Sequence, residues 1–210
     1  MIPLIQNFRT VILANGAFPK NPLPLEHLFR AKQIVCCDGA TQNLLDSGLK
    51  PDVIIGDLDS VSEEIKNRFS SILLHLAEQE TNDLTKAFHF CIENHQTEIT
   101  ILGATGKRED HTLGNLSLLT DYAEKATVQL LTDEGVFTPL LETATLESYP
   151  GEQISIFSLN PETTFTFHNL RYPVYNKKLT SWWQGTLNEA ESNSFTISFD
   201  KGKALVFREY

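Results

Sequence analysis

The chain has 210 residues, and its 17 basic and 27 acidic side chains give a formal net charge of −10 at neutral pH. This length allows one large domain or two smaller ones. The excess of acid argues against a broad nucleic-acid-binding or anionic-membrane surface, because both need a dense field of positive charge. We therefore expect no nucleic-acid or membrane partner, and an anionic ligand would need a local cluster of donors.

The cysteines and apolar runs indicate the compartment. Cys36, Cys37 and Cys91 form neither a CxxC pair nor an even-numbered disulfide framework, which favours a reducing environment. No apolar run reaches the roughly eighteen residues of a membrane span, and residues 1–9 lack the basic and apolar regions of a signal peptide. We expect a soluble cytoplasmic protein.

Residues 1–133 alternate short apolar runs with segments of helical periodicity. Such alternation predicts an α/β domain in which a mainly parallel, Rossmann-like sheet is flanked by helices. The runs expected to form strands are 11–14, 34–37, 53–55, 72–74, 99–102 and 128–131. The apolar stripes expected to mark helices are Leu44, Leu45 and Leu49, then Leu84, Ala87, Phe88, Cys91 and Ile92, then Leu113, Leu116, Leu119 and Tyr122.

Beyond residue 133 the pattern changes to alternation of polar and apolar residues. The segments 153–157, 163–167 and 194–199 have this period of two and are separated by turn residues. They predict an all-β region, which we expect to be a sandwich. The sequence thus predicts an α/β domain over residues 1–133 and a β-sandwich domain over residues 134–210.

The third apolar run ends at a glycine and is followed by Asp57 and Asp59. If strand geometry persists, these carboxylates leave the same side of the chain and repel each other, which favours a bound divalent cation. Alternatively, the two aspartates cap a turn and the following helix. Both interpretations stay open on these residues alone.

Polar residues also follow the other predicted strands. In an open α/β sheet, ligands bind beyond the carboxyl ends of the strands, so these residues are candidates for one site. Acids at several corresponding strand ends favour a metal-assisted phosphate site. The candidates are Asn15 after the first strand, Asp38 after the second, Glu80, Asn82 and Asp83 after the fourth, and 103–111 after the fifth.

The segment 103–111 contains two glycines that would let backbone amides approach an anion, and its Lys107 and Arg108 could neutralise phosphate charge. It matches neither a Walker loop nor a dinucleotide fingerprint. Alternatively, Arg108 and Asp110 form a loop salt bridge with the aspartate as a helix N-cap, and His111 has a structural place in the first turn.

These segments, in this order and spacing, resemble the thiamine pyrophosphokinase family. The resemblance spans most of the chain. The segments that carry it are 38–40, 51–60, 80–86, 103–111 with Asn115, and, in the β region, 169–173 and 185–189.

The resemblance implies an enzyme that transfers a diphosphoryl group from Mg-ATP to the hydroxyl of thiamine, giving thiamine diphosphate and AMP. It implies that Asp57, Asp59 and Asp83 bind Mg²⁺ and ATP phosphates, and that Arg108 and Asp110 complete the catalytic set. The residues implied on the nucleotide side are Asn15, Asp38, Glu80, Asn82, Lys86, Arg108, His111 and Asn115.

The family likeness also implies a homodimer whose active site lies between the α/β domain of one subunit and the β domain of its partner. Tyr172 would cover the thiamine, and Thr186 and Asn188 would form hydrogen bonds with its pyrimidine edge. Without the family likeness, Tyr172 would be interpreted as an aromatic residue on the surface of the sandwich.

Many relatives carry threonine at the position of Asn82 and glycine or an apolar residue near Lys107. The alternatives are a diphosphokinase acting on a hydroxymethylpterin and a non-catalytic nucleotide or thiamine sensor.

Overall fold

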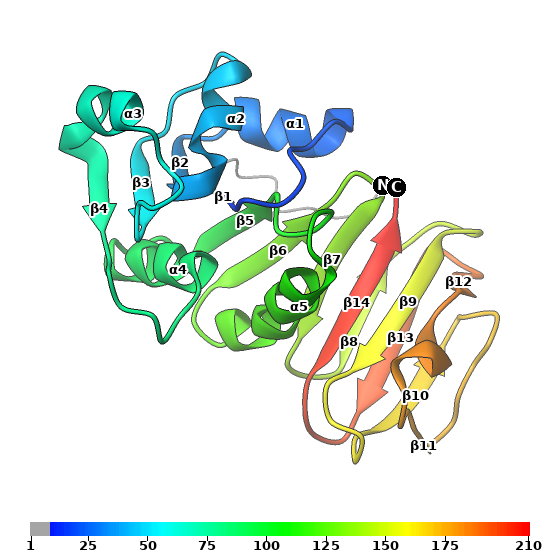
Figure 1. The fold of residues 1–210 in the computed structure, drawn as a ribbon. Helices are drawn as coiled ribbons and strands as arrows, with labels where there is room; N and C mark the ends of the chain where they lie inside the picture. Colours follow the sequence, from blue (N-terminus) through cyan, green and yellow to red (C-terminus); the bar gives the residue numbers. More distant parts are fainter. Residues whose placement is uncertain (1–8) are drawn as a thin grey trace. The chain divides into compact units, whose positions relative to one another are not determined.

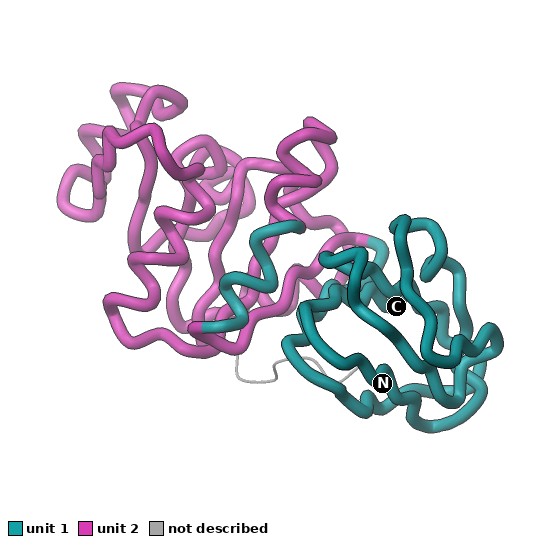
Figure 2. The backbone as a smooth tube through the Cα atoms, turned by 90° about the horizontal axis from the view of Figure 1, so that it is seen from below, with its two compact units in different colours: residues 1–6, 117–124, 134–210 teal, residues 7–116, 125–133 magenta. Residues whose placement is uncertain are grey.

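The computed structural model describes residues 9–210, which form two compact units (Figure 2). Within the described chain, residues 9–116 and 125–133 form one unit, here called the α/β unit, and residues 117–124 and 134–210 form the other, the β unit. The domain division at residues 133 and 134 stays a prediction.

The α/β unit contains six parallel strands in the order β4-β3-β2-β1-β5-β6 (Figure 1). The predicted α/β class and its mainly parallel sheet are confirmed, and each predicted strand is present within one residue. Central residues such as Ile12, Ile54 and Ile101 are fully buried, as expected for strands covered on both faces. The strands are β1 (Thr10–Leu13), β2 (Gln33–Cys37), β3 (Val53–Gly56), β4 (Leu73–His75), β5 (Glu98–Leu102) and β6 (Thr127–Leu131).

Side-chain caps fix where several helices begin. Asn21, Ser62 and Asn82 each accept a hydrogen bond from a backbone N–H in the first turn of the helix that follows. The helices are α1 (Pro22–Phe29), α2 (Thr41–Asp46), α3 (Glu63–Arg68), α4 (Asp83–Glu93) and α5 (Glu109–Ala123), with 3₁₀ turns η1 (Asp38–Ala40) and η2 (Ser70–Ile72).

The stripe predicted for the last of these helices is only half right. In α5, Leu119 and Tyr122 are buried, but Leu113 is 53% exposed and Leu116 is half-buried. Other residues of the first half of α5 line the cavity described below, and Leu113 and Leu116 belong neither to that lining nor to the buried core.

A buried polar cluster connects α1 to β5 and β6. His27 is 2% exposed, and its Nδ1 lies 3.5 Å from the Oγ1 of Thr100, which also accepts a hydrogen bond of 3.0 Å from Gln129 Nε2. Burial lowers the pKa of His27, because an imidazolium loses its hydration there.

This cluster predicts a pH dependence of stability. Because the folded-state pKa of His27 lies below the ordinary value of 6.5, the unfolded chain takes up the proton first, and stability falls as the pH drops through 6.5. The contribution of one group is at most about 1.4 kcal/mol per pH unit. The free energy of unfolding, measured with urea between pH 7.5 and 5.5, should change less with pH in His27→Gln than in the unmodified chain. An equal pH dependence in both chains would contradict the assignment.

The β unit consists of two antiparallel sheets (Figure 1), in the orders β12-β9-β14-β7 and β11-β10-β13-β8. Ile154 and Ile156 of the first sheet and Phe165, Phe195 and Ile197 of the second belong to one buried core, so the predicted sandwich is confirmed. The strands are β7 (Gly135–Leu140), β8 (Ala144–Glu147), β9 (Gln153–Ser158), β10 (Thr164–His168), β11 (Lys177–Lys178), β12 (Asn188–Glu189), β13 (Ser194–Phe199) and β14 (Ala204–Glu209), with a 3₁₀ turn η3 (Trp182–Gly185).

One ion pair lies inside this sandwich. Arg208 on β14 is 2% exposed, and its Nε and Nη2 donate to Glu152, which is fully buried, at 2.9 and 3.0 Å. Nη2 also donates to the carbonyl oxygen of Glu147.

Of the helices in residues 9–210, none combines the length and the apolar character needed to cross a membrane.

Candidate functional site

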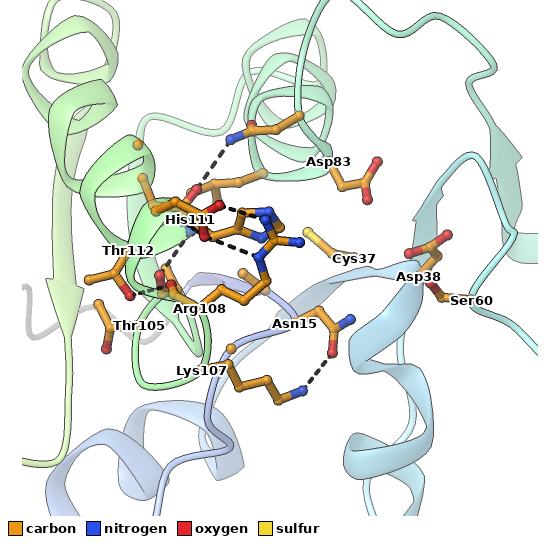
Figure 3. Close-up of a pocket in the computed structure, with 18 residues that line it drawn as sticks. Asn15, Cys37, Asp38, Ser60, Asp83, Thr105, Lys107, Arg108, His111 and Thr112 are labelled. Atoms are coloured by element: carbon orange, nitrogen blue, oxygen red, sulfur yellow. Dashed lines mark hydrogen bonds and ion pairs between the residues drawn. The ribbon is translucent and has the colours of Figure 1, made fainter.

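A cavity of about 500 Å³ opens in the α/β unit at the carboxyl ends of β1, β2 and β5 (Figure 3). Its lining comes from the segments that follow these strands and β3 and from the first turns of α4 and α5. This is the edge at which the sequence predicted a site. Of the predicted nucleotide-side and catalytic residues, the lining includes Asn15, Asp38, Asn82, Asp83, Arg108, Asp110, His111 and Asn115.

Two strand ends are tied together beside the cavity through their backbones. Gly16 N donates to Gly103 O, and Ala17 N donates to Thr105 O at 2.7 Å. A Cβ atom on Gly16 would lie 2.3 Å from both acceptor oxygens, so no other residue allows this approach without a shift. Gly103, at φ +65°, takes the left-handed conformation that the turn after β5 requires.

Asp38 fixes the segment that carries the paired aspartates. Its carboxylate is 4% exposed and accepts hydrogen bonds from Gly39 N and, at 2.9 Å, from Leu58 N. The side chain occupies the space over Gly56, where a Cβ would lie 2.5 Å from its Cγ. Burial raises the pKa of Asp38, the charges of Asp83 and Asp57 raise it further, and the two backbone hydrogen bonds partly offset them.

Asp57 and Asp59 follow directly, but neither side chain lines the cavity. Asp57 accepts hydrogen bonds from Asp59 N at 3.1 Å and from Gln79 Nε2 at 3.4 Å, and these contacts lower its pKa. Asp57 therefore closes a turn, as one interpretation of the sequence had it, whereas the helix that follows is capped by Ser62. A cation role for the pair stays a prediction.

The first turn of α4 brings acid, base and amide together. Asn82 caps the helix by accepting from Thr85 N at 2.9 Å, and its Nδ2 donates to Asn115 Oδ1 at 3.2 Å. Asp83 lines the cavity and forms an ion pair of 3.3 Å with Lys86, whose side chain is 4% exposed. This turn thus places the Asp83 carboxylate at the edge of the cavity and holds it against a buried cation.

The acids gather in one region without forming a closed coordination set. In the described part of the chain, no group of three or more His, Cys, Asp or Glu is arranged to hold a metal ion. Glu80 is exposed, lies outside the cavity lining, and donates through its backbone N to Glu78 at 2.8 Å. The structure therefore brings Asp38 and Asp83 to the cavity and leaves Asp57, Asp59 and Glu80 at its border or beyond.

Arg108 and Asp110 form an ion pair on the cavity side of α5. Arg108 Nη2 and Nε donate to the two carboxylate oxygens at 2.6 and 3.1 Å, and these bonds lower the pKa of Asp110 to about 2. The predicted salt bridge is thus present, but the predicted cap is wrong, because Asp110 lies within the first turn of α5. Both partners are exposed, so the pair adds little stability.

Three residues that face the cavity were not predicted as site residues: Cys37, Ser60 and Thr112 (Figure 3). Lys107 and Thr105 of the candidate segment 103–111 also line it, and Lys107 donates to Asn15 Oδ1 at 3.0 Å. Most of them directly follow or closely neighbour a predicted strand end. Their position near the strand ends could have identified them, whereas their residue types alone do not indicate a ligand site.

Two family models match the chain in order. The model described as "Thiamin pyrophosphokinase, catalytic domain" matches residues 25–131, and "Thiamin pyrophosphokinase, substrate-binding domain" matches residues 135–207. The chain belongs to the thiamin pyrophosphokinase family. The predicted family is thereby confirmed, as is the predicted class of diphosphotransferase enzyme, and neither the pterin nor the sensor alternative is favoured.

Relatives across most of the chain agree with this thiamin pyrophosphokinase assignment. Thiamine pyrophosphokinase of Bacillus subtilis (strain 168) is 29% identical over 182 residues, covering 81% of this chain and 84% of that protein. Thiamine pyrophosphokinase 1 of Oryza sativa subsp. japonica is 28% identical over 202 residues, covering 81% and 76%. The crystal structure of the Bacillus subtilis thiamine pyrophosphokinase superposes with a TM-score of 0.79 at 26% identity, covering 96% of this chain and 98% of that one.

The predicted thiamine contacts of this thiamin pyrophosphokinase lie in the β unit. Tyr172 is 60% exposed, and its backbone N and O bond the side chain of Asn188 at 3.0 and 2.9 Å. Asn188 is 4% exposed, so its amide holds the Tyr172 backbone, and Thr186 donates to Trp183 O at 2.8 Å. Direct contacts of these three side chains with a substrate stay predictions.

Proposed function

We propose that this chain transfers a diphosphoryl group from ATP to the hydroxyl of thiamine, giving thiamine diphosphate and AMP. The ordered match of a catalytic and a substrate-binding family model over residues 25–131 and 135–207 carries this proposal. The polar cavity at the strand ends supports it further, because open α/β sheets bind nucleotides at that edge.

The proposed reaction forms one phosphorus–oxygen bond, breaks another and releases one proton. The thiamine hydroxyl oxygen attacks the β-phosphorus of ATP, the bond from that phosphorus to the oxygen bridging to the α-phosphorus breaks, and AMP leaves. The hydroxyl proton passes to a carboxylate or to water. Negative charge grows on the oxygens of the transferred group and on AMP, so the site must supply positive charge and hydrogen-bond donors.

The donor set fits a hard divalent cation. We propose that Asp57, Asp59 and Asp83 hold Mg²⁺, with Asp38 nearby, because carboxylate oxygens are the ligands this ion prefers. The charges of Asp83 and Asp57 also raise the pKa of the buried Asp38, so a cation would relieve their repulsion. Mg²⁺ is commonly held by one or two carboxylates together with water and substrate phosphates, so a preformed group of three protein ligands is not required. When bound, it would neutralise charge on the phosphate oxygens.

The other cavity residues supply groups suited to a nucleotide. Asn82 and Asn115 are joined to each other, and Asn115 Nδ2 also donates to Ala104 O at 2.8 Å, so these amides are held in place. Arg108 directly precedes α5 and His111 lies in its first turn, and they supply a guanidinium and an imidazole. We propose that these residues, with Asn15, Glu80 and Lys86, form the nucleotide side of the site.

AMP release tests the proposed reaction. Purified protein with Mg²⁺ and ATP should release AMP only when thiamine is added, and thiamine diphosphate should accumulate in equal amount. Replacing thiamine by 6-hydroxymethyl-7,8-dihydropterin is the specificity control, and AMP formed with the pterin alone would overturn the proposal in favour of the related diphosphokinase. Nucleotide binding by calorimetry without any AMP would favour the sensor.

We also propose a homodimer in which the partner's β unit contributes to the site. The β unit exposes several large aromatic and aliphatic side chains, which a partner subunit would cover. Sedimentation equilibrium at micromolar concentration should give twice the chain mass of 23.6 kDa, and a monomer with full activity would contradict this proposal. The side chains concerned are Tyr172, Tyr175, Trp182, Trp183 and Leu187.

A cytoplasmic location remains part of the proposal. Cys36, Cys37 and Cys91 are free and buried, which suits a reducing compartment. Recovery of the protein in the membrane fraction of lysed cells would count against it.

A further inference from the structure

Lys107 is a cation of the cavity lining that the family likeness does not assign. It lies in the segment between β5 and α5, at the cavity, and its Nζ donates to Asn15 Oδ1 at 3.0 Å (Figure 3). The contact joins the ends of β1 and β5, which are neighbours in the parallel sheet. Lys107 therefore reaches the place where the strand-end residues converge.

Lys107 and the neighbouring Arg108 are both cations, but they contact different partners. Arg108 is held by two hydrogen bonds to the carboxylate of Asp110, so a phosphate would have to compete with that carboxylate for the guanidinium. Within the cavity lining that the structure describes, Lys107 pairs instead with the neutral amide of Asn15. Exchanging an amide oxygen for a phosphate oxygen turns a neutral acceptor into a charged one, which strengthens the hydrogen bond.

The backbone fixes where the lysine starts, while its side chain stays adaptable. Gly106, at φ +83°, packs closely enough on Ala17 that a Cβ would lie 2.7 Å from the alanine Cβ, and Thr105 O accepts from Ala17 N. The loop is therefore held against the end of β1. Four side-chain torsions let the ammonium group leave Asn15 and follow a ligand.

We propose that Lys107 is a specificity-determining residue that binds the diphosphoryl end of the nucleotide and so favours ATP over AMP. This inference rests on the proposed function. The ammonium moves from Asn15 to an oxygen of the group being transferred, which AMP lacks. Because such a contact exists before and during the reaction, it should act mainly on KM for ATP rather than on kcat.

Kinetics of Lys107→Met give the first test. KM for ATP should rise roughly tenfold or more, because a hydrogen bond between two charged groups is lost, while kcat, KM for thiamine and the inhibition constant of AMP stay within about twofold. Lys107→Arg should restore most of the affinity. Lys50→Met, which removes an exposed lysine elsewhere in the same unit, is the matched control and should leave KM unchanged.

Two outcomes would overturn the inference: an unchanged KM for ATP in Lys107→Met, or a parallel loss of AMP affinity, which would put the lysine at the α-phosphate. Calorimetry with α,β-methylene-ATP separates this inference from the proposed reaction, because it needs no turnover. If Lys107→Met binds this analogue more weakly than the unmodified chain does, the lysine assignment is supported. If the unmodified chain also makes no thiamine diphosphate from ATP, the lysine assignment stands while the proposed reaction is refuted. Equal binding of the analogue to both chains would refute the lysine assignment.

Discussion

Asp57→Asn should lower kcat/KM for thiamine diphosphate formation by about 100-fold or more, the scale seen when a group that stabilises transition-state charge is removed. The variant keeps the size of the side chain and retains one oxygen that can accept from Asp59 N, which the native Oδ1 contacts at 3.1 Å. The longer contact of 3.4 Å between Gln79 Nε2 and the native Oδ2 is lost, because an amide NH₂ group cannot accept from it. The variant also loses the negative charge proposed to hold Mg²⁺.

The fold should tolerate this change. The charge of Asp57 raises the pKa of Asp38, so removing it relieves one repulsion, but the hydrogen bonds that lower the pKa of Asp57 itself show that the fold also stabilises this charge. Because these two effects oppose each other, the urea unfolding midpoint of Asp57→Asn should stay close to that of the unmodified chain. Loss of activity would then report chemistry, not unfolding.

Glu64→Gln provides the matched control, because Glu64 is an exposed acid of α3 in the same unit, outside the cavity lining. It should keep full activity. The concentration of Mg²⁺ needed for half-maximal rate should rise in Asp57→Asn and not in Glu64→Gln. Full activity in Asp57→Asn at low Mg²⁺ would remove Asp57 from the proposed metal set.

Arg208→Met should destabilise the protein by about 3–5 kcal/mol, the largest stability effect we expect from one substitution. Its partner Glu152 is fully buried and accepts two hydrogen bonds from the guanidinium, so the variant leaves a carboxylate in an apolar core without a counter-charge. Urea unfolding followed by tryptophan fluorescence measures the loss.

A double variant distinguishes loss of the pair from loss of packing. Arg208→Met with Glu152→Leu removes both charges, so it should recover most of the stability lost in the single variant. Lys178→Met breaks an exposed ion pair with Glu162 in the same unit and should leave the unfolding midpoint close to that of the unmodified chain. A double variant as unstable as Arg208→Met alone would show that the arginine acts through packing.

The strands of the α/β unit could be predicted because their chemistry is simple. A strand buried on both faces has a continuous apolar run in its sequence, as β1 and β3 do. The helix α1 could not, because prolines at its start, Pro22 and Pro24, resemble a turn in sequence and are compatible with a first helical turn only once Asn21 caps it. The strand β14 was missed for another reason, since its first four residues form a continuous apolar run rather than the alternation that marks the other predicted strands of the β unit.

The site was predictable in position and less so in pairing. Strand-end residues such as Asn15, Asp38 and Asp83 do converge on one cavity, as the topology of a parallel sheet demands. Which side chains form hydrogen bonds or ion pairs with one another depends on distances in space, and these cannot be deduced from spacing in the sequence. The salt bridge between Arg108 and Asp110 was one of the alternatives that the sequence offered, whereas the hydrogen bonds between the Asn188 amide and the Tyr172 backbone became visible only in three dimensions.

The contact between Asn188 and Tyr172 has a consequence for variation within this protein. Asn188 holds the loop through main-chain atoms that every amino acid provides except proline at the donor position. The ring at position 172 can therefore be exchanged without loosening the loop that carries it, whereas the residue at 188 cannot. The side chain at position 172 can therefore change during evolution, and with it the contacts of the loop, while Asn188 keeps the loop in the same conformation.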